Sequence, residues 1–432
     1  MFVLDSQTPK RKFDYKWVIV GICILIMLIG TGFVPNRGLC MGSITEKLGV
    51  SRDVFSLNDT LRFLTTAVCN LFFGFFISKF GSKKLICTGI VIYIGAFLTY
   101  SMASTIPMFY LAGMLTGCAV SLVGTTMIGS VINRWCKENT GTITGLAMAS
   151  TGVGSAIASQ VLTPIIEKSI NGYKTAYRIS ALLLAILLVV VFLFYKEKQK
   201  EPGETAAKKK KKFRGRAWEG LSYSDTAKKA YFYAALICIF FTGFCVQGFV
   251  SVTSLHMKDV GMPLYVLKWA PTMHAIIFIF CKFGTGFMYD KTGLRKTSSV
   301  CTIASVITLL MMAMYTNSTF GIVLAFVSQV ISSFAIPLET VMLPIYAGDL
   351  FGQKAFDKIM GIFVACNVAG YAAGVPAMNF WYRFFGSYNG ILIINAFIMF
   401  AVFVALQFII TAAHKEKKKL EMNENETEEV TA

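Results

Sequence analysis

Charged residues are scarce in this chain. Asp, Glu, Lys and Arg make up 15% of its 432 residues, whereas 55% are hydrophobic, and the mean hydropathy is +0.62. A soluble protein of this length needs more charge than this to cover its surface. The composition therefore excludes a soluble globular protein and predicts a multi-pass membrane protein, which we place in the plasma membrane.

Motifs that carry enzyme chemistry are also missing. The sequence has no C-x-x-C, no H-E-x-x-H and no P-loop, and its three histidines stand far apart. The eleven cysteines are scattered, mostly within apolar runs, where cysteine usually behaves as a small apolar residue. No extramembrane domain offers room for a soluble active site. We therefore expect no metal, no cofactor and no enzymatic activity, and we disfavour a receptor.

Apolar runs recur along the whole chain, and each is long enough to cross about 30 Å of hydrocarbon. The runs are continuous rather than alternating, which indicates helices and not a membrane barrel. The first run, starting at Trp17, is too long for the apolar core of a cleaved signal. The sequence thus predicts an all-α membrane protein of twelve transmembrane helices, at about 17–39, 56–78, 85–104, 107–132, 140–164, 177–195, 230–256, 264–288, 297–316, 319–347, 358–381 and 388–411.

Positive charge is distributed unevenly between the two sides that these spans create. An even number of spans leaves both termini on one side. If that side is cytoplasmic, thirty of the 41 Lys and Arg residues lie in cytoplasmic segments, eight lie outside and three lie within spans. Cytoplasmic loops carry an excess of Lys and Arg, so both termini are predicted to be cytoplasmic. Because topology explains the net charge of +18, we expect no nucleic-acid partner.

The longest cytoplasmic connection follows the sixth span and contains the run Lys208–Lys212. A run of like charges repels itself and stays solvated, so we interpret this segment as a linker, with contact to anionic membrane lipid as the alternative. Ser222 and Asp225 offer helix caps before the seventh span, and the tail beyond Ala413 is expected to be disordered. The predicted division is a cytoplasmic N-terminal segment (1–16), an N-terminal six-helix bundle (17–195), the linker (196–229), a C-terminal six-helix bundle (230–411) and a cytoplasmic tail (412–432).

One turn occurs twice, about half the chain apart. After the second span it contains Gly74, Ser78 and Gly81, and after the eighth span it contains Gly286, Asp290, Gly293 and Arg295. Two six-helix halves that each carry a G-x-x-x-[DS]-K-x-G-x-[KR]-K turn resemble the major facilitator superfamily over the whole membrane portion. The resemblance implies that these seven residues form a gate motif at the cytoplasmic side. Ser78 replaces the acid of that motif, which implies a weaker latch in the N-terminal half.

A second set of motifs narrows the resemblance. The segments Asn133–Gly141, Gly145–Gly154 and Gly172–Arg178 are similar to patterns of the monocarboxylate transporters and the oxalate:formate antiporters. That resemblance implies a substrate cation at Lys282, four residues before Gly286. It also extends to Arg37 the role of the first-helix lysine that the monocarboxylate transporters place just after a proline, although Arg37 stands one position later. The antiporters have a second lysine in the eleventh helix, where this chain has neutral Asn367, so the resemblance argues against a dianionic substrate.

Three cations stand inside apolar runs: Arg37, Arg62 and Lys282. A charged side chain in hydrocarbon costs roughly 3 kcal/mol on insertion scales and marks a functional site by default. The structural alternative for each is a standing ion pair, such as Arg62 with Asp59. An anionic substrate needs fixed cations at its site, because a carboxylate alone is not tolerated in hydrocarbon. Candidate wall residues are His274, which shares a helix face with Lys282 and is otherwise a packed core histidine, and the pair Asn367 and Tyr371.

Glu339 is the one acid well inside a predicted span. A buried carboxylate near a cation can have its ionisation switched, which makes it the proton-coupling candidate. A permanent salt bridge to Lys282 or Arg37 is the alternative.

The sequence therefore predicts a secondary transporter of small organic anions, with monocarboxylates foremost, working by proton symport or anion exchange. The predicted partners are the anion, a proton or counter-anion, and membrane lipid. The alternatives are transport of another solute (a sugar, an amino acid or a drug) on the same fold, or a nutrient sensor that does not transport.

Overall fold

The computed structural model describes residues 15–35, 37–50, 52–136, 138–169, 171–197 and 220–431, and these residues are helical with no strand among them. The run Lys208–Lys212 and the segment before Tyr15 lie outside the described residues. Ten described helices are long and apolar enough to cross a membrane. The bent pair within Leu57–Phe80 and the shorter apolar helix Lys16–Gly32 supply the first two spans, which completes twelve.

The first bundle is built from the helices before the linker. Each apolar run forms one helix or a helix interrupted near its middle. The bounds are α1 Lys16–Leu25, the π-helix η1 Ile26–Gly32, α2 Arg37–Leu48, α3 Arg52–Leu71, α4 Phe73–Phe80, α5 Ser82–Met102, α6 Ile106–Val123, α7 Thr125–Trp135, α8 Thr140–Lys168 and α9 Gly172–Phe194.

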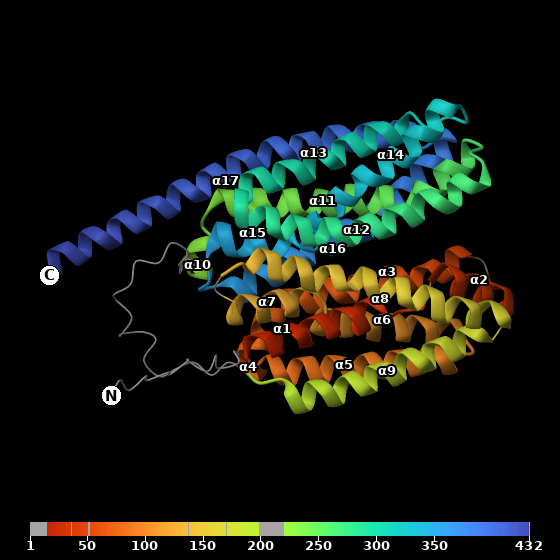
Figure 1. Cartoon of the computed structure of the whole chain (residues 1–432), viewed down its shortest axis with the longest axis horizontal. Coiled ribbons are helices and arrows are strands. Elements are labelled where there is room, and N and C mark those ends of the chain that lie inside the picture. The colour runs from red at the N-terminus through yellow and green to blue at the C-terminus, as the bar shows by residue number, and fades with distance from the viewer. Residues whose placement is uncertain are drawn as a thin grey trace, which may run out of the picture.

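The second bundle follows the linker and lies beside the first (Figure 1). Ser222 caps its opening one-turn helix by accepting a hydrogen bond from the backbone N–H of Asp225, as the sequence predicted. The bounds are α10 Tyr223–Thr226, α11 Ala230–Asp259, α12 Leu264–Thr292, α13 Leu294–Ala313, α14 Thr319–Ala335, the 3-10 helix η2 Ile336–Glu339, α15 Met342–Phe351, α16 Phe356–Phe385 and α17 Asn389–Thr431.

Four spans are interrupted where the sequence predicted continuous helix. The second bends by 57° at Phe72 and the fourth is interrupted at Gly124, whereas the first and the tenth break near a proline. The first was expected over 17–39, but regular helix ends at Gly32, and Pro35 follows in a non-helical segment. The tenth was expected over 319–347, but Pro337 stands in a 3-10 turn that ends at Glu339. Proline removes a backbone hydrogen bond and disfavours helix before it. Non-helical backbone at membrane depth occurs where it is buried in protein or lines a cavity, so both breaks point to a site.

The tail after Ala413 was predicted to be disordered, and this prediction is wrong. Helix α17 continues to Thr431 and projects beyond the bundle in Figure 1. The segment has no Gly or Pro and is rich in Glu and Lys, which are good helix formers. Lys229 also forms an ion pair with Glu416, which ties the extended helix to the start of α11.

The end of the molecule at which residues 195–197 leave and residues 220–229 return is called the linker end below. The first described residue lies there, because the Tyr15 hydroxyl donates to the carbonyl of Phe194 at 2.5 Å. The far part of α17 lies there as well (Figure 1). Both ends of the described chain therefore share one end of the molecule, as an even number of spans requires.

The bundles meet along two helix pairs, α8 with α12 and α3 with α16, and this contact surface is called the seam below. Glycines bring the backbones together. A Cβ on Gly286 would lie 2.0 Å from the carbonyl oxygen of Gly141, and one on Gly74 would lie 2.7 Å from Cα of Lys358. Such small-residue contacts are a usual way for membrane helices to pack closely. The four residues in these contacts all lie in the half of their helix nearer the linker end, so the bundles are closely packed at that end: Gly74, Gly141, Gly286 and Lys358.

We predict that Gly286→Ala destabilises the protein by about 1–3 kcal/mol, because the added methyl meets backbone that cannot move aside. Gly284→Ala is the matched control, since a Cβ at Gly284 meets nothing within 4 Å on the same helix. Thermal unfolding of the two purified variants in detergent checks this. Equal melting temperatures for both variants would contradict the close packing at Gly286.

Candidate substrate site and gate

Lys282 lies at the seam and is 4% exposed. Its ammonium donates to the Thr151 hydroxyl at 2.9 Å and to the carbonyl oxygen of Met148 at 3.4 Å, both on α8 of the other bundle. It also lies 4.1 Å from the ring centroid of Phe278, one turn away on α12. Among the described residues no carboxylate lies within 4.0 Å of this ammonium. The charge is thus held by neutral groups.

Glu339 occupies the 3-10 turn of the tenth span and is 7% exposed. Tyr371 of α16 lies close enough to its carboxyl group for the two to interact electrostatically, while Oε1 has no hydrogen-bond partner among the described residues. The charges of Glu339 and Lys282 act on each other without direct contact. A permanent Lys282–Glu339 salt bridge, one alternative from the sequence, is therefore absent in this conformation of the described chain.

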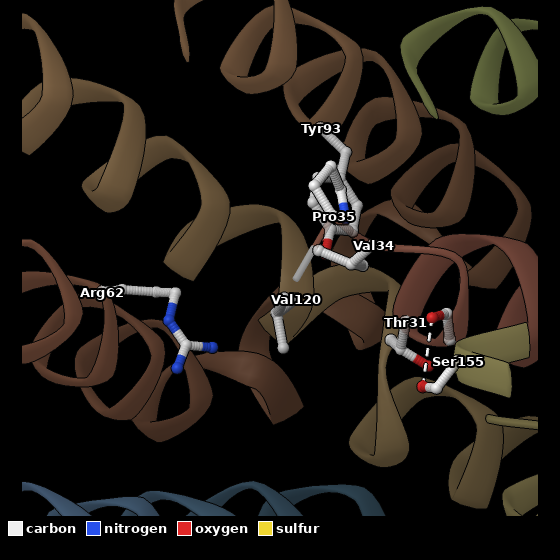
Figure 2. A pocket seen from close by; sticks show the side chains of 8 residues that line it. Thr31, Val34, Pro35, Arg62, Tyr93, Val120 and Ser155 are labelled. Atoms are coloured by element: carbon white, nitrogen blue, oxygen red, sulfur yellow. Dashed lines mark hydrogen bonds between the residues drawn. The ribbon is translucent and has the colours of Figure 1, made fainter. Parts of the chain in front are cut away.

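A cavity of about 270 Å³ lies within the first bundle beside the break in the first span. Arg62 stands on one side of it, and Thr31 and Ser155 stand on the other (Figure 2). Ser155 donates to the carbonyl of Gly32 at 3.2 Å and lies one turn along α8 from Thr151, the acceptor of Lys282. The remaining lining residues are Gly32, Val34, Pro35, Tyr93 and Val120.

Arg62 links this cavity to the second bundle. Its Nε lies 3.4 Å from Oδ1 of Asp59, one turn earlier, which is the local pair considered from the sequence. Its guanidinium stacks over Phe63, whose ring meets Tyr371 edge-on at 5.8 Å between centroids. The charge of Arg62 also acts on Tyr371. The structure therefore brings Arg62, Tyr371, Glu339 and Lys282 into one chain of contacts and charge interactions across the seam.

The other candidates fall into different places. His274 contacts α14 two turns from Lys282, toward the end opposite the linker. Asn367 is buried and donates to the carbonyl of Ile239 at 3.2 Å, so it joins α16 to α11 and lies apart from the cross-seam chain. Arg37 begins α2, but its side chain lies outside the described residues.

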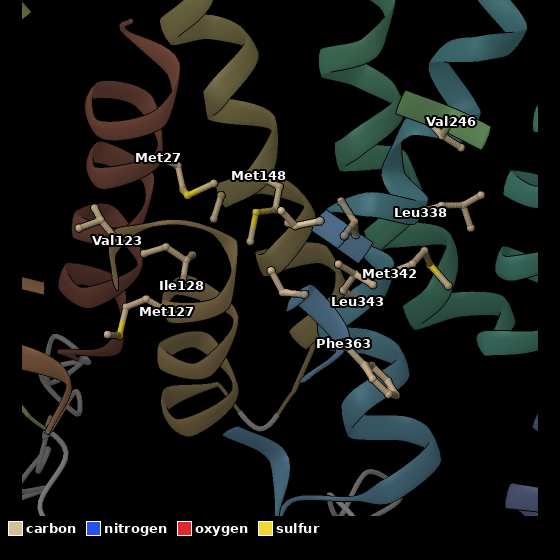
Figure 3. Close-up of a cluster of buried hydrophobic side chains, with 14 of the residues drawn as sticks. Met27, Val123, Met127, Ile128, Met148, Val246, Leu338, Met342, Leu343 and Phe363 are labelled. Atoms are coloured by element: carbon tan, nitrogen blue, oxygen red, sulfur yellow. The ribbon is translucent and has the colours of Figure 1, made fainter. Parts of the chain in front are cut away.

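An apolar layer separates the site from the linker end. Met148 and Ile128 from the first bundle face Leu343 and Met342 from the second (Figure 3). Along their helices, Met148 lies nearer the linker end than Thr151, and Ile128 lies nearer to it than Val120. Met342 and Leu343 likewise lie nearer to it than Glu339. Buried side chains of both bundles therefore close the seam on the linker side of Lys282 and Glu339.

Polar contacts close the same end. Asp290 accepts hydrogen bonds from the backbone N–H groups of Gly141 at 3.0 Å and Thr142 at 2.6 Å, at the start of α8. A carboxylate at a helix N-terminus satisfies unpaired N–H groups and the helix dipole. Gly293 follows with a φ of +82°, which lets the chain reverse. Arg295, two residues further on, donates a hydrogen bond to the Thr411 hydroxyl.

The first copy of the turn is built differently. Ser78 donates to Phe75 of its own helix, and the Glu197 carboxylate lies beside Gly81 and accepts from the backbone of Ser82. The cross-seam polar contact at this corner comes instead from Asp357 of α16, which accepts from Ser130 and pairs with Arg134. The described cross-seam hydrogen bonds all lie between the linker end and the level of Lys282.

Sequence reasoning missed the neutral partners of the charges. Thr151 and Ser155 belong to a helix crowded with Gly, Ala, Ser and Thr, where small polar residues are common and give no local sign of a special partner. Ser332 and Ser333 gave no signal, because one serine in an apolar run looks like another. The break at Glu339 did have a signal in Pro337, two residues earlier.

Two helical bundles with breaks beside a cavity and a charged seam define a secondary transporter. The sequence model of the Major Facilitator Superfamily matches residues 20–267 and 235–431, and the chain belongs to this superfamily. It is a multi-pass protein of the plasma membrane that moves a small molecule together with an ion or counter-substrate.

Specific relatives agree with this assignment. The chain is 22% identical to an oxalate:formate antiporter of Oxalobacter formigenes, over 94% of each chain. Its fold matches a proton:xylose symporter with a TM-score of 0.74 at 11% identity, covering 92% of this chain and 97% of that one. It also matches the FucP transporter in its outward conformation with a TM-score of 0.68 at 12% identity, covering 91% and 99%. These structural likenesses concern the fold alone.

We predict that Asp290→Asn opens the linker end, because a charged cap at the start of α8 is lost. A cap contributes about 0.5–2 kcal/mol, so the open fraction should rise roughly twofold to thirtyfold. Pulsed EPR distances between nitroxides at exposed Lys79 and Lys291, in a cysteine-free background, measure the opening. Asp225→Asn, which alters an exposed acid away from the seam, should leave the distances unchanged, and an unchanged distribution in Asp290→Asn would reject the latch.

Proposed function

We propose that the protein carries small organic anions, monocarboxylates foremost, by alternating access of the halves 17–195 and 230–411. The observation that carries the proposal is the buried ammonium of Lys282, held only by a hydroxyl, a carbonyl and an aromatic ring. A cation in this setting is stabilised far more by a visiting carboxylate than by neutral acceptors. The printed activity of the Oxalobacter relative, oxalate:formate antiport, supports a small carboxylate.

The cavity supports a small substrate with one charge. At about 270 Å³ it lies just below the range of pockets that hold drug-sized ligands. The charge of Lys282 is opposed by Glu339, and that of Arg62 by Asp59. Asn367, already bonded to α11, adds no positive charge. A site whose described charges come in opposed pairs suits a monoanion better than a dianion.

Alternating access changes the partners of Lys282. We propose both termini are cytoplasmic, so the closed linker end makes this conformation outward-facing. When the bundles rock, α8 moves away from α12, and Lys282 loses Thr151 and Met148. The substrate or Glu339, which stays in the same half as Lys282, then replaces them. A proton on Glu339 and an anion on Lys282 would cross as one neutral load.

We predict that Lys282→Gln lowers carboxylate uptake more than a hundredfold. The substrate carboxylate would lose its buried cation, and removing one partner of a buried ion pair costs about 3–5 kcal/mol. Proteoliposomes with labelled formate, acetate, lactate and oxalate, with and without a pH gradient, provide the measurement. Lys258→Gln, at an exposed lysine of α11, is the control and should retain uptake. Full carboxylate uptake by Lys282→Gln, or uptake of uncharged xylose in place of any acid by the wild type, would overturn the proposal.

A second prediction concerns Glu339→Gln. The neutral amide cannot pair with Lys282 in the empty carrier, so the return step without substrate should fail while substrate exchange continues. We expect counterflow of the labelled acid to persist and net uptake driven by a pH gradient to fall at least tenfold. Glu46→Gln, at an exposed residue of α2, is the matched control. Loss of both reactions, or of neither, would remove Glu339 from proton coupling.

A further inference from the structure

His274 lies in a polar cluster that the transport scheme above does not use. Its Nδ1 lies 3.1 Å from the carbonyl oxygen of Gln329, 3.0 Å from the Ser332 hydroxyl and 3.0 Å from the Ser333 hydroxyl. All three partners belong to α14. A half-buried histidine with this many partners on a single nitrogen has a defined ring orientation.

The same contacts define the tautomer. A carbonyl oxygen only accepts hydrogen bonds, so the contact with Gln329 favours a proton on Nδ1. Both serine hydroxyls are placed to donate to that same carbonyl, at 2.9 and 3.0 Å, so neither needs Nδ1 as an acceptor. The neutral ring therefore carries its lone pair on Nε2. The next proton to bind His274 must bind Nε2 and make the ring a cation.

Such a cation would be coupled to Lys282 through Phe278. The His274 ring stacks on the Phe278 ring, with centroids 5.9 Å apart and planes 17° apart, and the same ring carries the Lys282 ammonium 4.1 Å from its centroid. The three residues follow one face of α12 at intervals of one turn. His274 and Lys282 are about 12 Å apart along the helix axis at 1.5 Å per residue.

Few other charges act on His274. The elements packed against α12 are α8, α11, α13, α14 and η2. By sequence, α14 has no ionisable residue, α8 has none between Thr140 and Ile166, and the charged residues of α11 and α13 lie at the helix ends. The remaining ionisable groups on these elements are Lys282, Glu339, Tyr315 (bonded to Ser328), His256, whose ring stacks on Tyr315, and the thiols of Cys281 and Cys301.

We propose that His274 is a proton-dependent second cation of the anion site, so that proton binding at Nε2 and anion binding at Lys282 favour each other. This inference rests on the proposed function and deepens it, because it adds a proton site distinct from Glu339. The anion offsets the repulsion between the two cations, and the coupling is reciprocal by linkage. Gln329, Ser332 and Ser333 are positioning residues, since they direct the incoming proton to Nε2.

The expected effect follows from Coulomb's law. Two unit charges about 12 Å apart at an effective dielectric of about 20 give roughly a tenfold change in affinity. Acidification from about pH 8 to about pH 6 spans the range in which histidine takes up its proton. Small carboxylic acids remain ionised over that range, so the ligand itself does not change.

The test is equilibrium binding of labelled formate, acetate and lactate to the purified full-length protein at about pH 6 and about pH 8. We expect wild-type affinity to rise several-fold at the lower pH, with about tenfold as the limit for a fully protonated ring. His274→Asn keeps an amide donor near the Nδ1 position but has no second site for a proton. Its affinity should match the wild type at about pH 8 and show no rise at about pH 6.

Controls separate this inference from its competitors. His414→Asn alters a histidine at the linker end and should keep the wild-type rise in affinity. His274→Gln should lose the rise as His274→Asn does, because both variants lack the second proton site although their side chains differ in size. Ser332→Ala with Ser333→Ala should weaken the rise. A full rise in His274→Asn, or its loss only in Glu339→Gln, overturns the role of His274 alone. Failure of the wild type to bind any of the three acids at either pH overturns the proposed function as well.

Discussion

A positive charge buried where two helical bundles meet is the constraint on which the rest of the structure depends. Hydrocarbon does not solvate an ammonium, so Lys282 requires partners in every conformation that the carrier visits. In the conformation described here those partners are neutral and belong to the opposite bundle. In the transport cycle that we propose, separation of the bundles removes these partners and couples the movement of the halves to binding of an anion at Lys282.

The linker end closes through two corners that differ in chemistry. At one corner Asp290 of the second bundle caps a helix of the first, and at the other Asp357 of the second bundle pairs with Arg134 of the first. Both acids come from the second bundle, although the turn motif is present in both halves. The substitution of serine at position 78 removes the acid that symmetry would place in the first bundle. Opening therefore breaks contacts in which the acids come from the second bundle, together with the neutral amide pair of Asn133 and Gln353.

Much of this arrangement could be predicted from particular residues. A lysine within an uninterrupted apolar run singled out Lys282, and the spacing of Asp59 and Arg62 anticipated their local pair. The repeated turn implied a gate motif, and in the structure Gly286 lies at a close helix approach and Gly293 at a chain reversal. The tail was misjudged, because its charge pattern was taken for disorder although its residues are good helix formers. The partners of the charges could not be predicted, since Thr151 and Ser333 look like many other small polar residues in neighbouring spans.

The sequence by itself determined the class of protein, the twelve spans, the repeated half and the identity of the intramembrane charges. These follow from hydropathy and local spacing, which act over a few helical turns. The tertiary structure decided which charges have neutral partners, that Glu339 stands in a broken helix with one oxygen unsatisfied, and that Nδ1 of His274 faces Gln329, Ser332 and Ser333. Each of these depends on which helix faces which across the bundle. Helix packing depends on shape at atomic scale, and residues far apart in the chain carry no local sign of it.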